Sequence, residues 1–279
     1  MSDSYHLGRI AKEIRRSIVK MNSASFASHS GSALSVVDIL TTLYFKVLNI
    51  DPDNPSKKDR DIVILSKGHG SSALYAALAH RGFFELSVLG KFYTDNGILP
   101  GHLDKEAAPG VEVSSGSLGH GLSVGLGMAI ARKRSKSASR VVVISGDGEL
   151  NEGSMWEAIM FAPQQKVDNL TLVVDYNKLQ GYGETNEVIN LEPLKAKFES
   201  FNWLVLEVDG HNFDEVERAF LVETQQPKVI VAHTVKGKGV SYMEGQFIWH
   251  YKSQTLRSFC KHTGNYRERG VCKNLNRRG

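Results

Sequence analysis

The stretch that decides the fold runs from Arg140 to Gly183 and reads RVVVISGDGELNEGSMWEAIMFAPQQKVDNLTLVVDYNKLQGYG. It opens with the run VVVI at 141–144, which is apolar without alternation, as in a strand buried on both faces. A helical pattern of apolar residues follows the triplet Gly-Asp-Gly at 146–148, and a second buried strand covers residues 170–174. The stretch therefore predicts a β-α-β unit with a polar cluster at the carboxyl end of each strand, where open α/β sheets bind ligands.

Three oxygen groups at these two strand ends fit a hard divalent cation. Asp147 offers a carboxylate, Asn177 a side-chain carbonyl and Leu179 a backbone carbonyl, and such ligands suit Mg²⁺ or Ca²⁺. About three places remain on an octahedral ion, which two phosphate oxygens and a water would fill. Gly146 and Gly148 would let the backbone approach a phosphate, and the helix after them would point its first amides at the anion. Taken alone, Asp-Gly is equally a hairpin signal, but a helix and not a strand follows it here.

The rest of the chain repeats the alternation of strands and helices. Apolar periodicity predicts strands at 61–65, 203–208 and 228–232 and helices at 7–21, 71–80 and 213–223. The loop after the strand at 61–65, SKGHG, should share the sheet edge of Asp147. We predict an α/β fold with a single doubly wound domain over residues 1–250, in which helices flank a mostly parallel sheet, and a basic tail over 251–279.

Two local features of the helices are predicted as well. Ser35 is expected to cap the start of a helix that carries the apolar residues from 36 to 44. A helix of small residues follows position 121, and its Gly125, Gly127 and Ala129 are expected to permit close packing.

Four of the ten histidines lie in loops rich in glycine or serine: His29, His69, His102 and His120. Neighbouring glycines give a ligand access to the ring, and imidazole exchanges protons near neutral pH, as an enzyme that acts on carbonyl compounds requires. Four other histidines are interpreted as solvated polar residues: His6, His80, His211 and His262.

Read together, GDGELNEGSMWEA and LVVDYNKLQ resemble the thiamine diphosphate motif in the form found in transketolases. The similarity extends to HSG, LSKGHGS, LPGHLD, GSLGHGLSVGLGMA and VKGKGVSYME followed by WH, in the expected order over roughly residues 5 to 250. The resemblance implies the diphosphate-binding (PP) module of the thiamine diphosphate-binding fold. It also implies thiamine diphosphate with Mg²⁺ or Ca²⁺ as cofactors.

The resemblance implies roles for individual residues. Histidines matching His29, His69, His102 and His250 line the cofactor and contact substrate hydroxyls in transketolases. Glu152 matches an acid in the proton network between paired active sites, although an acid in a first helical turn is also favoured by the helix dipole. The expected catalytic residues are His29, His102, His250 and Glu152. The expected cofactor-binding residues are His69, Gly116, Leu118, Gly146, Asp147, Gly148, Asn177 and His250, where Gly116 and Leu118 match residues whose backbone meets the pyrimidine ring.

Two positions depart from the family. His120 stands where many transketolases have glutamine, which leaves its role open. Tyr251 stands where glycine usually follows Trp-His. Beyond it, we expect solvated disorder for the tail, with a partner-docking strip as the alternative.

Transketolases activate the cofactor with a glutamate from a second, pyrimidine-binding domain. A chain of 279 residues filled by one α/β domain has no room for it. We therefore expect the N-terminal half of a split, two-chain transketolase whose partner is a separate C-terminal subunit with the pyrimidine-binding domain. In the family, the second domain that covers the site comes across a subunit interface, so we expect an α2β2 heterotetramer. We expect the complex to act on sugar phosphates, as in pentose phosphate metabolism. We expect no activity from this chain alone.

Composition points to a soluble globular protein, with 41% hydrophobic and 23% charged residues. There is no apolar run near the roughly 18 residues of a membrane helix, the N-terminus does not read as a signal peptide, and Cys260 and Cys272 are too few for a disulfide framework. We expect a cytoplasmic protein that binds no membrane. Residues 251–279 hold eight Lys or Arg and one Glu, a net charge of +7, so the remainder of a chain with a total of +4 is −3. The net positive charge therefore lies in the tail and does not predict nucleic acid binding by the rest of the chain.

Two other functions stay open from the sequence. The α subunit of a 2-oxo acid dehydrogenase-like complex uses the same cofactor and is also split, and a non-catalytic half-subunit could bind or regulate a partner. The loops SKGHGS and LPGHLD favour transfer of a two-carbon ketol group from a ketose phosphate to an aldose phosphate. Asp147, Asn177 and the loop histidines argue against a non-catalytic role, because a binding module has no use for them.

Overall fold

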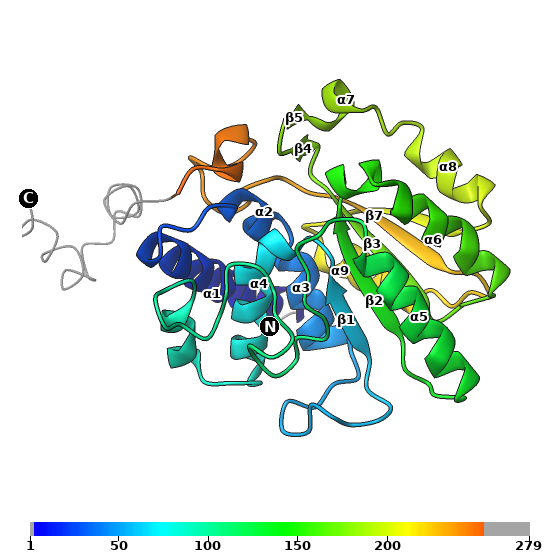
Figure 1. Cartoon of the computed structure of the whole chain (residues 1–279), viewed down its shortest axis with the longest axis horizontal. Helices are drawn as coiled ribbons and strands as arrows, with labels where there is room; N and C mark the ends of the chain where they lie inside the picture. The colour runs from blue at the N-terminus through cyan, green and yellow to red at the C-terminus, as the bar shows by residue number, and fades with distance from the viewer. Residues whose placement is uncertain (1–2, 254–279) are drawn as a thin grey trace, which may run out of the picture.

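The computed structural model describes residues 3–253, and a five-stranded sheet forms the centre of this part of the chain (Figure 1). The strands lie in the order β1-β2-β3-β7-β6, and each pair of neighbours is parallel. The prediction of a mostly parallel sheet is confirmed. The bounds of the strands are β1 (Ile62–Leu65), β2 (Val141–Gly146), β3 (Leu170–Tyr176), β6 (Leu204–Asp209) and β7 (Lys228–His233).

Helices cover both faces of the sheet (Figure 1). In β1, Val63 and Leu65 join one buried cluster, whereas Ile62 and Ile64 join the other. The first cluster is shared with α1 (Asp3–Ala24), α3 (Val37–Thr42), α4 (Ser71–Arg81) and α9 (Phe213–Leu221). The second is shared with α5 (Gly121–Arg134), α6 (Gly153–Gln164) and α8 (Leu194–Ser200). In β1, β2 and β3 nearly every residue is buried, so these strands carry apolar runs without alternation, and the doubly wound prediction is confirmed.

Short elements occupy several of the loops between the main helices and strands. A two-stranded hairpin follows β3 and is made of β4 (Leu179–Gln180) and β5 (Gly183–Glu184), with α7 (Thr185–Val188) directly after it. The other short elements are α2 (Ser30–Ser35), η1 (Leu43–Val47), η2 (Gly68–Gly70), η3 (Leu86–Lys91), η4 (Gly148–Asn151) and η5 (Phe247–His250).

The predicted capping role of Ser35 is wrong. Ser35 is the last residue of α2, and the helical stretch is interrupted at Val36 before α3 begins. The Ser35 hydroxyl lies 2.6 Å from Oδ2 of Asp175, to which it donates a hydrogen bond. Ser35 therefore bonds to a buried carboxylate 140 positions away and does not cap a helix, which is the role that local sequence predicts.

Close packing of α5 is confirmed at Gly125 and Ala129 but is wrong at Gly127. Ala129 is fully buried. A Cβ at Gly125 would lie 2.4 Å from Cγ2 of Val143, so α5 approaches β2 more closely there than any other residue would allow. A Cβ at Gly127 would meet nothing within 4 Å, because this position faces away from the sheet.

The predicted tail is described only as far as residue 253. Its remainder lies outside the described residues, together with Cys260, Cys272 and His262. Within residues 3–253, none of the helices combines the length and the apolar character needed to cross a membrane.

Candidate active site

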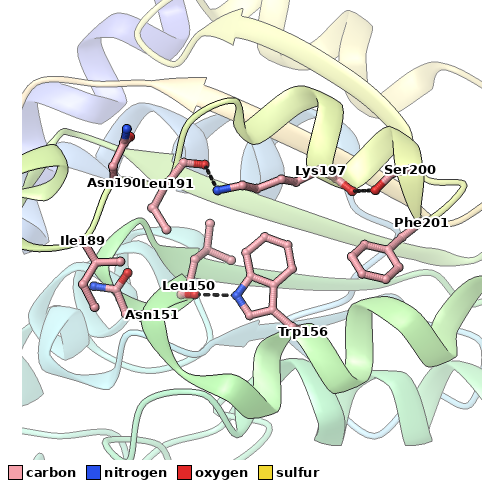
Figure 2. A pocket seen from close by; sticks show the side chains of 9 residues that line it. All are labelled: Leu150, Asn151, Trp156, Ile189, Asn190, Leu191, Lys197, Ser200 and Phe201. Atoms are coloured by element: carbon pink, nitrogen blue, oxygen red, sulfur yellow. Dashed lines mark hydrogen bonds between the residues drawn. The ribbon is translucent and has the colours of Figure 1, made fainter.

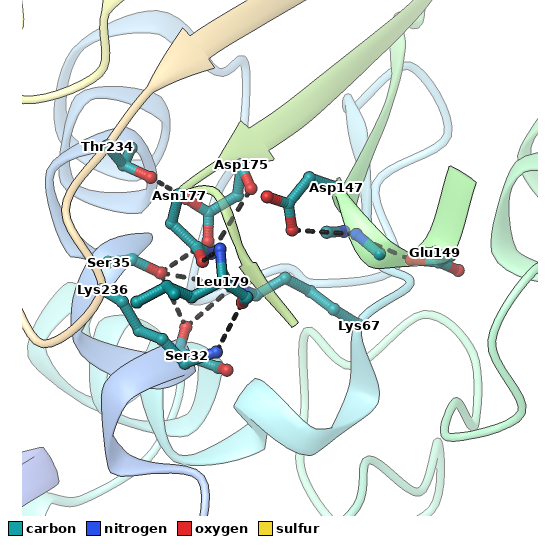
Figure 3. A network of polar contacts seen from close by, with 12 residues as sticks. Ser32, Ser35, Lys67, Asp147, Glu149, Asp175, Asn177, Leu179, Thr234 and Lys236 are labelled. Carbon is teal, nitrogen blue, oxygen red and sulfur yellow. Dashed lines mark hydrogen bonds and ion pairs between the residues drawn. The ribbon is translucent and has the colours of Figure 1, made fainter. Parts of the chain in front are cut away.

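Three strand ends meet at the carboxyl edge of the sheet, and each is followed by a polar residue (Figure 3). Lys67 follows β1, Asp147 follows β2 and Asn177 follows β3. The strands are parallel and in register, with Gly146 opposite Asp175. The prediction that the loop after β1 shares this edge with Asp147 is confirmed.

Asp147 is buried, with 2% of its surface exposed. Its Oδ1 accepts a hydrogen bond from the amide of Gly148 at 2.8 Å, and its Oδ2 accepts from the amide of Lys178 at 2.7 Å and from Oγ1 of Thr185 at 3.0 Å. Burial, together with the neighbouring carboxylate of Asp175, raises the pKa of Asp147. These neutral donors fix the side chain but bring no positive charge, so a bound cation would stabilise its ionised form.

Asn177 and Leu179 supply the other two predicted oxygens beside Asp147 (Figure 3). Oδ1 of Asn177 accepts a hydrogen bond from the amide of Leu179 at 3.2 Å. The carbonyl of Leu179 accepts one from Nζ of Lys236 at 2.7 Å. Each carbonyl oxygen keeps a second lone pair, so both remain available to a metal ion.

Lys236 joins this oxygen set to the histidines, and sequence reasoning missed it. Its Nζ lies 2.9 Å from Nδ1 of His250 while it also donates to Leu179. The side chain is 1% exposed, and burial and the nearby ammonium of Lys67 lower the pKa of Lys236 to about 8. A partly desolvated ammonium group at this edge can bind an anion such as a phosphate.

A second buried lysine, Lys67, forms the floor of the site with Asp175 (Figure 3). Its ammonium is ion-paired to that carboxylate and also donates to the carbonyl of Ser32 at 2.8 Å. Thr234 and Ser35 donate to the same carboxylate, so Asp175 is held by three partners. Burial alone would raise the pKa of Asp175, but the Lys67 ammonium and the two hydroxyl donors outweigh it and lower that pKa. Neither partner of this pair was singled out from the sequence.

Glu149 is a further buried acid that the sequence did not single out. Its carboxylate accepts hydrogen bonds from the hydroxyl of Ser66 and from the amide of Gly119 at 2.9 Å, and the amide of Gly146 lies 3.4 Å away. Burial raises the pKa of Glu149, and these hydrogen bonds oppose the shift. Glu149 therefore ties the end of β2 to the loop before α5.

The four histidines that the family resemblance assigns to the site lie together. The ring centroid of His29 is 5.0 Å from that of His250, 5.2 Å from that of His69 and 6.2 Å from that of His102. His69 and His250 are 5.7 Å apart. We call these four residues the histidine cluster. Its members come from segments up to 221 positions apart, which only the fold brings together.

Three members of the histidine cluster are neutral at physiological pH. Burial lowers the pKa of His29 to about 4 and that of His250 to about 3, with further lowering by neighbouring cationic groups. Burial and the Lys67 ammonium also hold the pKa of His69 well below its usual range. Neutral imidazole offers one donor and one acceptor nitrogen, which suits hydrogen bonds to hydroxyl groups.

The remaining predicted residues lie around the cluster. A Cβ at Gly116 would lie 3.1 Å from Cδ2 of His102, so Gly116 is beside the cluster, and Leu118 is half-buried in the same loop. His120 is exposed directly before α5. Glu152 is exposed directly before α6 and makes no capping hydrogen bond.

The helical pattern predicted after the Gly-Asp-Gly loop is confirmed, because α6 contains the apolar residues from Met155 to Met160. A short 3-10 turn, η4, intervenes, and α6 begins only at Gly153. The amide of Gly148 donates to Asp147 itself. The ammonium of Lys236 is a positive charge at this edge, where it contacts the carbonyl of Leu179.

Two histidines interpreted as solvated are in fact paired. Nδ1 of His211 lies 2.7 Å from Oδ2 of Asp38, and its Nε2 accepts a hydrogen bond from the amide of Val235 at 2.8 Å. His211 thus braces the loop that carries Lys236. Nε2 of His80 lies 2.9 Å from Oγ of Ser17. His6 is exposed, in agreement with the prediction.

A pocket of about 360 Å³ lies between α6 and α8 and is separate from this edge (Figure 2). Its lining is mainly apolar and includes Trp156 and Phe201. The indole nitrogen of Trp156 donates to the carbonyl of Leu150 at 2.8 Å, and Nζ of Lys197 donates to that of Leu191 at 2.8 Å. Its mainly apolar lining distinguishes this pocket from the carboxyl edge, where the buried lysines Lys67 and Lys236 lie.

The residues at the carboxyl edge fit the expected metal and phosphate groups. Asp147, Asn177 and Leu179 form a set of hard oxygen donors of the kind that Mg²⁺ and Ca²⁺ prefer. Two buried polar atoms beside them, Nδ1 of His29 and Nε2 of Gln180, find no hydrogen-bond partner within the described chain. Unpartnered buried polar atoms are costly, and a polar ligand would satisfy them.

Comparisons with known proteins agree with this chemistry. The family described as "Transketolase, thiamine diphosphate binding domain" matches residues 8–253. The chain is 45% identical over 249 residues to an apulose-4-phosphate transketolase subunit of Actinobacillus succinogenes, and the match covers 88% of this chain and 90% of that protein. It is 42% identical over 225 residues to the 6-deoxy-6-sulfo-D-fructose transketolase subunit SqwG of a Clostridium species, where the match covers 80% and 82%.

Solved structures show the same fold. The transketolase of Campylobacter jejuni superimposes with a TM-score of 0.85 at 30% sequence identity, over 91% of this chain. The chain spans 41% of the length of that protein. It therefore matches one part of a longer transketolase, whereas it matches the two subunits above over most of their length.

Proposed function

This chain belongs to the transketolase family, and on that basis we propose that it is the thiamine diphosphate-binding, N-terminal subunit of a two-chain transketolase. The enzyme transfers a two-carbon ketol group from a ketose phosphate to an aldose phosphate, and this chain acts together with a separate C-terminal subunit. The subunit names of its relatives support the two-chain organisation. Both relatives, and the full-length solved structure, are transketolases, which favours ketol transfer over the 2-oxo acid dehydrogenase alternative.

One observation carries the proposal. The oxygen set of Asp147, Asn177 and Leu179 and the histidine cluster lie at the same sheet edge, and Lys236 contacts both through Leu179 and His250. A ligand with an anionic group at one end and a reactive centre at the other could therefore span the two. The non-catalytic alternative gives no reason for this arrangement. We take residues 1–250 as the domain that binds the cofactor.

We propose that Asp147, Asn177 and the carbonyl of Leu179 hold Mg²⁺ or Ca²⁺ together with the diphosphate. Lys236 would neutralise the same group, His69 would hydrogen-bond it, and Gly146 and Gly148 would leave space for it. The backbone of Gly116 and Leu118 would meet the pyrimidine ring. When bound, thiamine diphosphate supplies the carbon nucleophile that accepts and releases the ketol group.

The chain's own side chains orient the sugar and move its protons in this proposal. His29, His102 and His250 would hydrogen-bond the substrate's hydroxyl groups. The low pKa values of His29 and His250 keep their rings neutral, so each can donate from one nitrogen and accept at the other. Glu152 is exposed before α6, which supports a contact with a group outside this chain.

The partner is proposed to be a C-terminal transketolase subunit with the pyrimidine-binding domain, in an α2β2 heterotetramer located in the cytoplasm. His102 and Glu152, two of the proposed catalytic residues, are exposed, so a second subunit could cover them and exclude water. We propose no nucleic acid or membrane partner, since the charge of residues 1–250 is slightly negative.

The proposal is tested by reconstitution. The purified chain is assayed for ketol transfer from a ketose phosphate to an aldose phosphate, alone and mixed with its C-terminal partner, with thiamine diphosphate and Mg²⁺ present. We expect no transfer from the chain alone, and transfer with a larger mass by light scattering after mixing. Robust turnover by the isolated chain would contradict the two-chain proposal.

A further inference from the structure

Tyr251 makes contacts that none of the predicted roles uses. Its hydroxyl donates a hydrogen bond to the carbonyl of Gly181, at 2.7 Å, in the turn of the β4–β5 hairpin. Its ring packs edge-on against the ring of His250, with centroids 4.7 Å apart. One side chain at the mouth of the histidine cluster therefore contacts both the cluster and the hairpin.

The β4–β5 hairpin forms one wall of the site. It begins with Leu179, whose carbonyl belongs to the oxygen set, and α7 directly after it begins with Thr185, which donates to Asp147 at 3.0 Å. Between them, Oε1 of Gln180 accepts from Nδ2 of Asn151 at 3.3 Å. Movement of the hairpin would therefore displace a proposed metal ligand and a side chain that orients Asp147.

The hairpin turn is shaped to receive Tyr251. A Cβ at Gly181 would lie 2.7 Å from the Tyr251 hydroxyl and 3.4 Å from Nε2 of His250. Any residue larger than glycine at 181 would push the tyrosine off the turn. Glycine, the residue usual at position 251 in the resemblance, could make neither the hydrogen bond nor the ring contact.

We propose that Tyr251 is a positioning residue that ties the β4–β5 hairpin to His250 and so fixes both walls of the diphosphate site. The expected effect on the cofactor rests on the proposed function. The contacts of Tyr251 with Gly181 and His250 do not depend on it, because they lie within the chain. Tyr251 does not touch the oxygen set. It acts through Gly181 on the hairpin and through ring packing on His250.

The test compares Tyr251→Phe with Tyr182→Phe. The first variant keeps the ring against His250 and deletes only the hydroxyl. Tyr182 lies in the same hairpin turn but is 85% exposed, so Tyr182→Phe is the matched control. Amide hydrogen exchange of residues 179–184 is measured on the cofactor-free protein, and thiamine diphosphate affinity is measured by calorimetry on the reconstituted complex with Mg²⁺.

We expect Tyr251→Phe to speed exchange in the hairpin and to weaken thiamine diphosphate binding by about two- to tenfold, the loss typical of one neutral hydrogen bond. The melting temperature and the kcat at saturating cofactor should stay close to wild type, which separates positioning from a role in general stability. Tyr251→Gly should have a larger effect on both exchange and affinity, and Tyr182→Phe should have none.

If amide hydrogen exchange of residues 179–184 is unchanged in both Tyr251 variants, Tyr251 does not hold the hairpin. Faster exchange with unchanged cofactor affinity would overturn its role in the site. If the wild-type complex binds no thiamine diphosphate, the proposed function fails instead, and hydrogen exchange still decides whether Tyr251 holds the hairpin.

Discussion

Lys67 and Asp175 form an ion pair in the interior of the protein, with side chains that are 1% and 0% exposed. The lysine follows β1 and the aspartate lies in β3, so the pair spans β2, the strand that Asp147 follows. It fixes the floor of the candidate site, and it also places a carboxylate close enough to raise the pKa of Asp147 beyond the effect of burial.

Breaking this pair should destabilise the protein strongly. Lys67→Met leaves the Asp175 carboxylate buried without its cation, and Asp175→Asn leaves the ammonium without its anion. We expect each to lower the free energy of unfolding by about 3–5 kcal/mol, measured by urea denaturation. The double variant should lose less than the sum of the two single losses, because it leaves no unpaired charge. Additive losses would show that the pair does not act as a unit.

Two histidines of the cluster should affect different steps. His102 is exposed at the outer end of the cluster, so His102→Ala should lower kcat by about 10²-fold and leave thiamine diphosphate affinity nearly unchanged. His69 lies next to Lys67 at the inner end, so His69→Ala should weaken cofactor binding by about tenfold. Steady-state kinetics and calorimetry on the reconstituted complex separate the two. Full activity and affinity in both variants would remove these residues from the site.

The neutral histidines make stability depend on pH. The unfolded chain binds a proton on each histidine near pH 6.5, whereas the pKa of His29 in the folded protein is about 4. The contribution of His29 to stability is therefore fully present above pH 6.5 and is lost as the pH drops from 6.5 towards 4, because the unfolded state binds more protons in this range. His29→Asn should reduce this slope by up to about 1.4 kcal/mol per pH unit. Equal slopes in the wild type and His29→Asn would contradict the assignment.

Helix α5 offers a matched pair of glycine variants. Gly125→Ala would press a methyl group into Val143, so we expect a loss of about 1–3 kcal/mol in the free energy of unfolding. Gly127→Ala meets open space, so it should be neutral or stabilising by up to about 1 kcal/mol through helix propensity. Urea midpoints of the two variants, compared with wild type, decide this. Equal effects would contradict the close approach of α5 to β2.

Local sequence was sufficient to predict the two central strands of the site and the residues that follow them. The apolar runs of β2 and β3 are continuous because both faces are buried, so the β-α-β unit could be identified without a structure. Asp147 and Asn177 come directly after those strands, so their position at the carboxyl edge of the sheet could be predicted as well. The presence of Leu179 beside them also follows from its position two residues later.

Side chains that pair across long separations could not be predicted. Asp175 is held by Ser35, Lys67 and Thr234, which are 140, 108 and 59 positions away. Ser35 reads locally as a helix cap because nothing nearby reveals its distant acceptor. Lys236 reads as an ordinary charged residue in a glycine loop. A buried lysine is costly unless it is paired, and its partners become visible only in the folded chain.

The most direct test of the central claim is cofactor binding by Asp147→Ala. Thiamine diphosphate is titrated into the reconstituted complex by calorimetry with Mg²⁺ present, with Asp53→Ala as the control. Asp53 is an exposed acid in the loop before β1, which begins at the opposite edge of the sheet. Circular dichroism establishes that both variants are folded. We predict no measurable binding by Asp147→Ala and normal binding by Asp53→Ala, whereas wild-type affinity in the Asp147 variant would contradict the account.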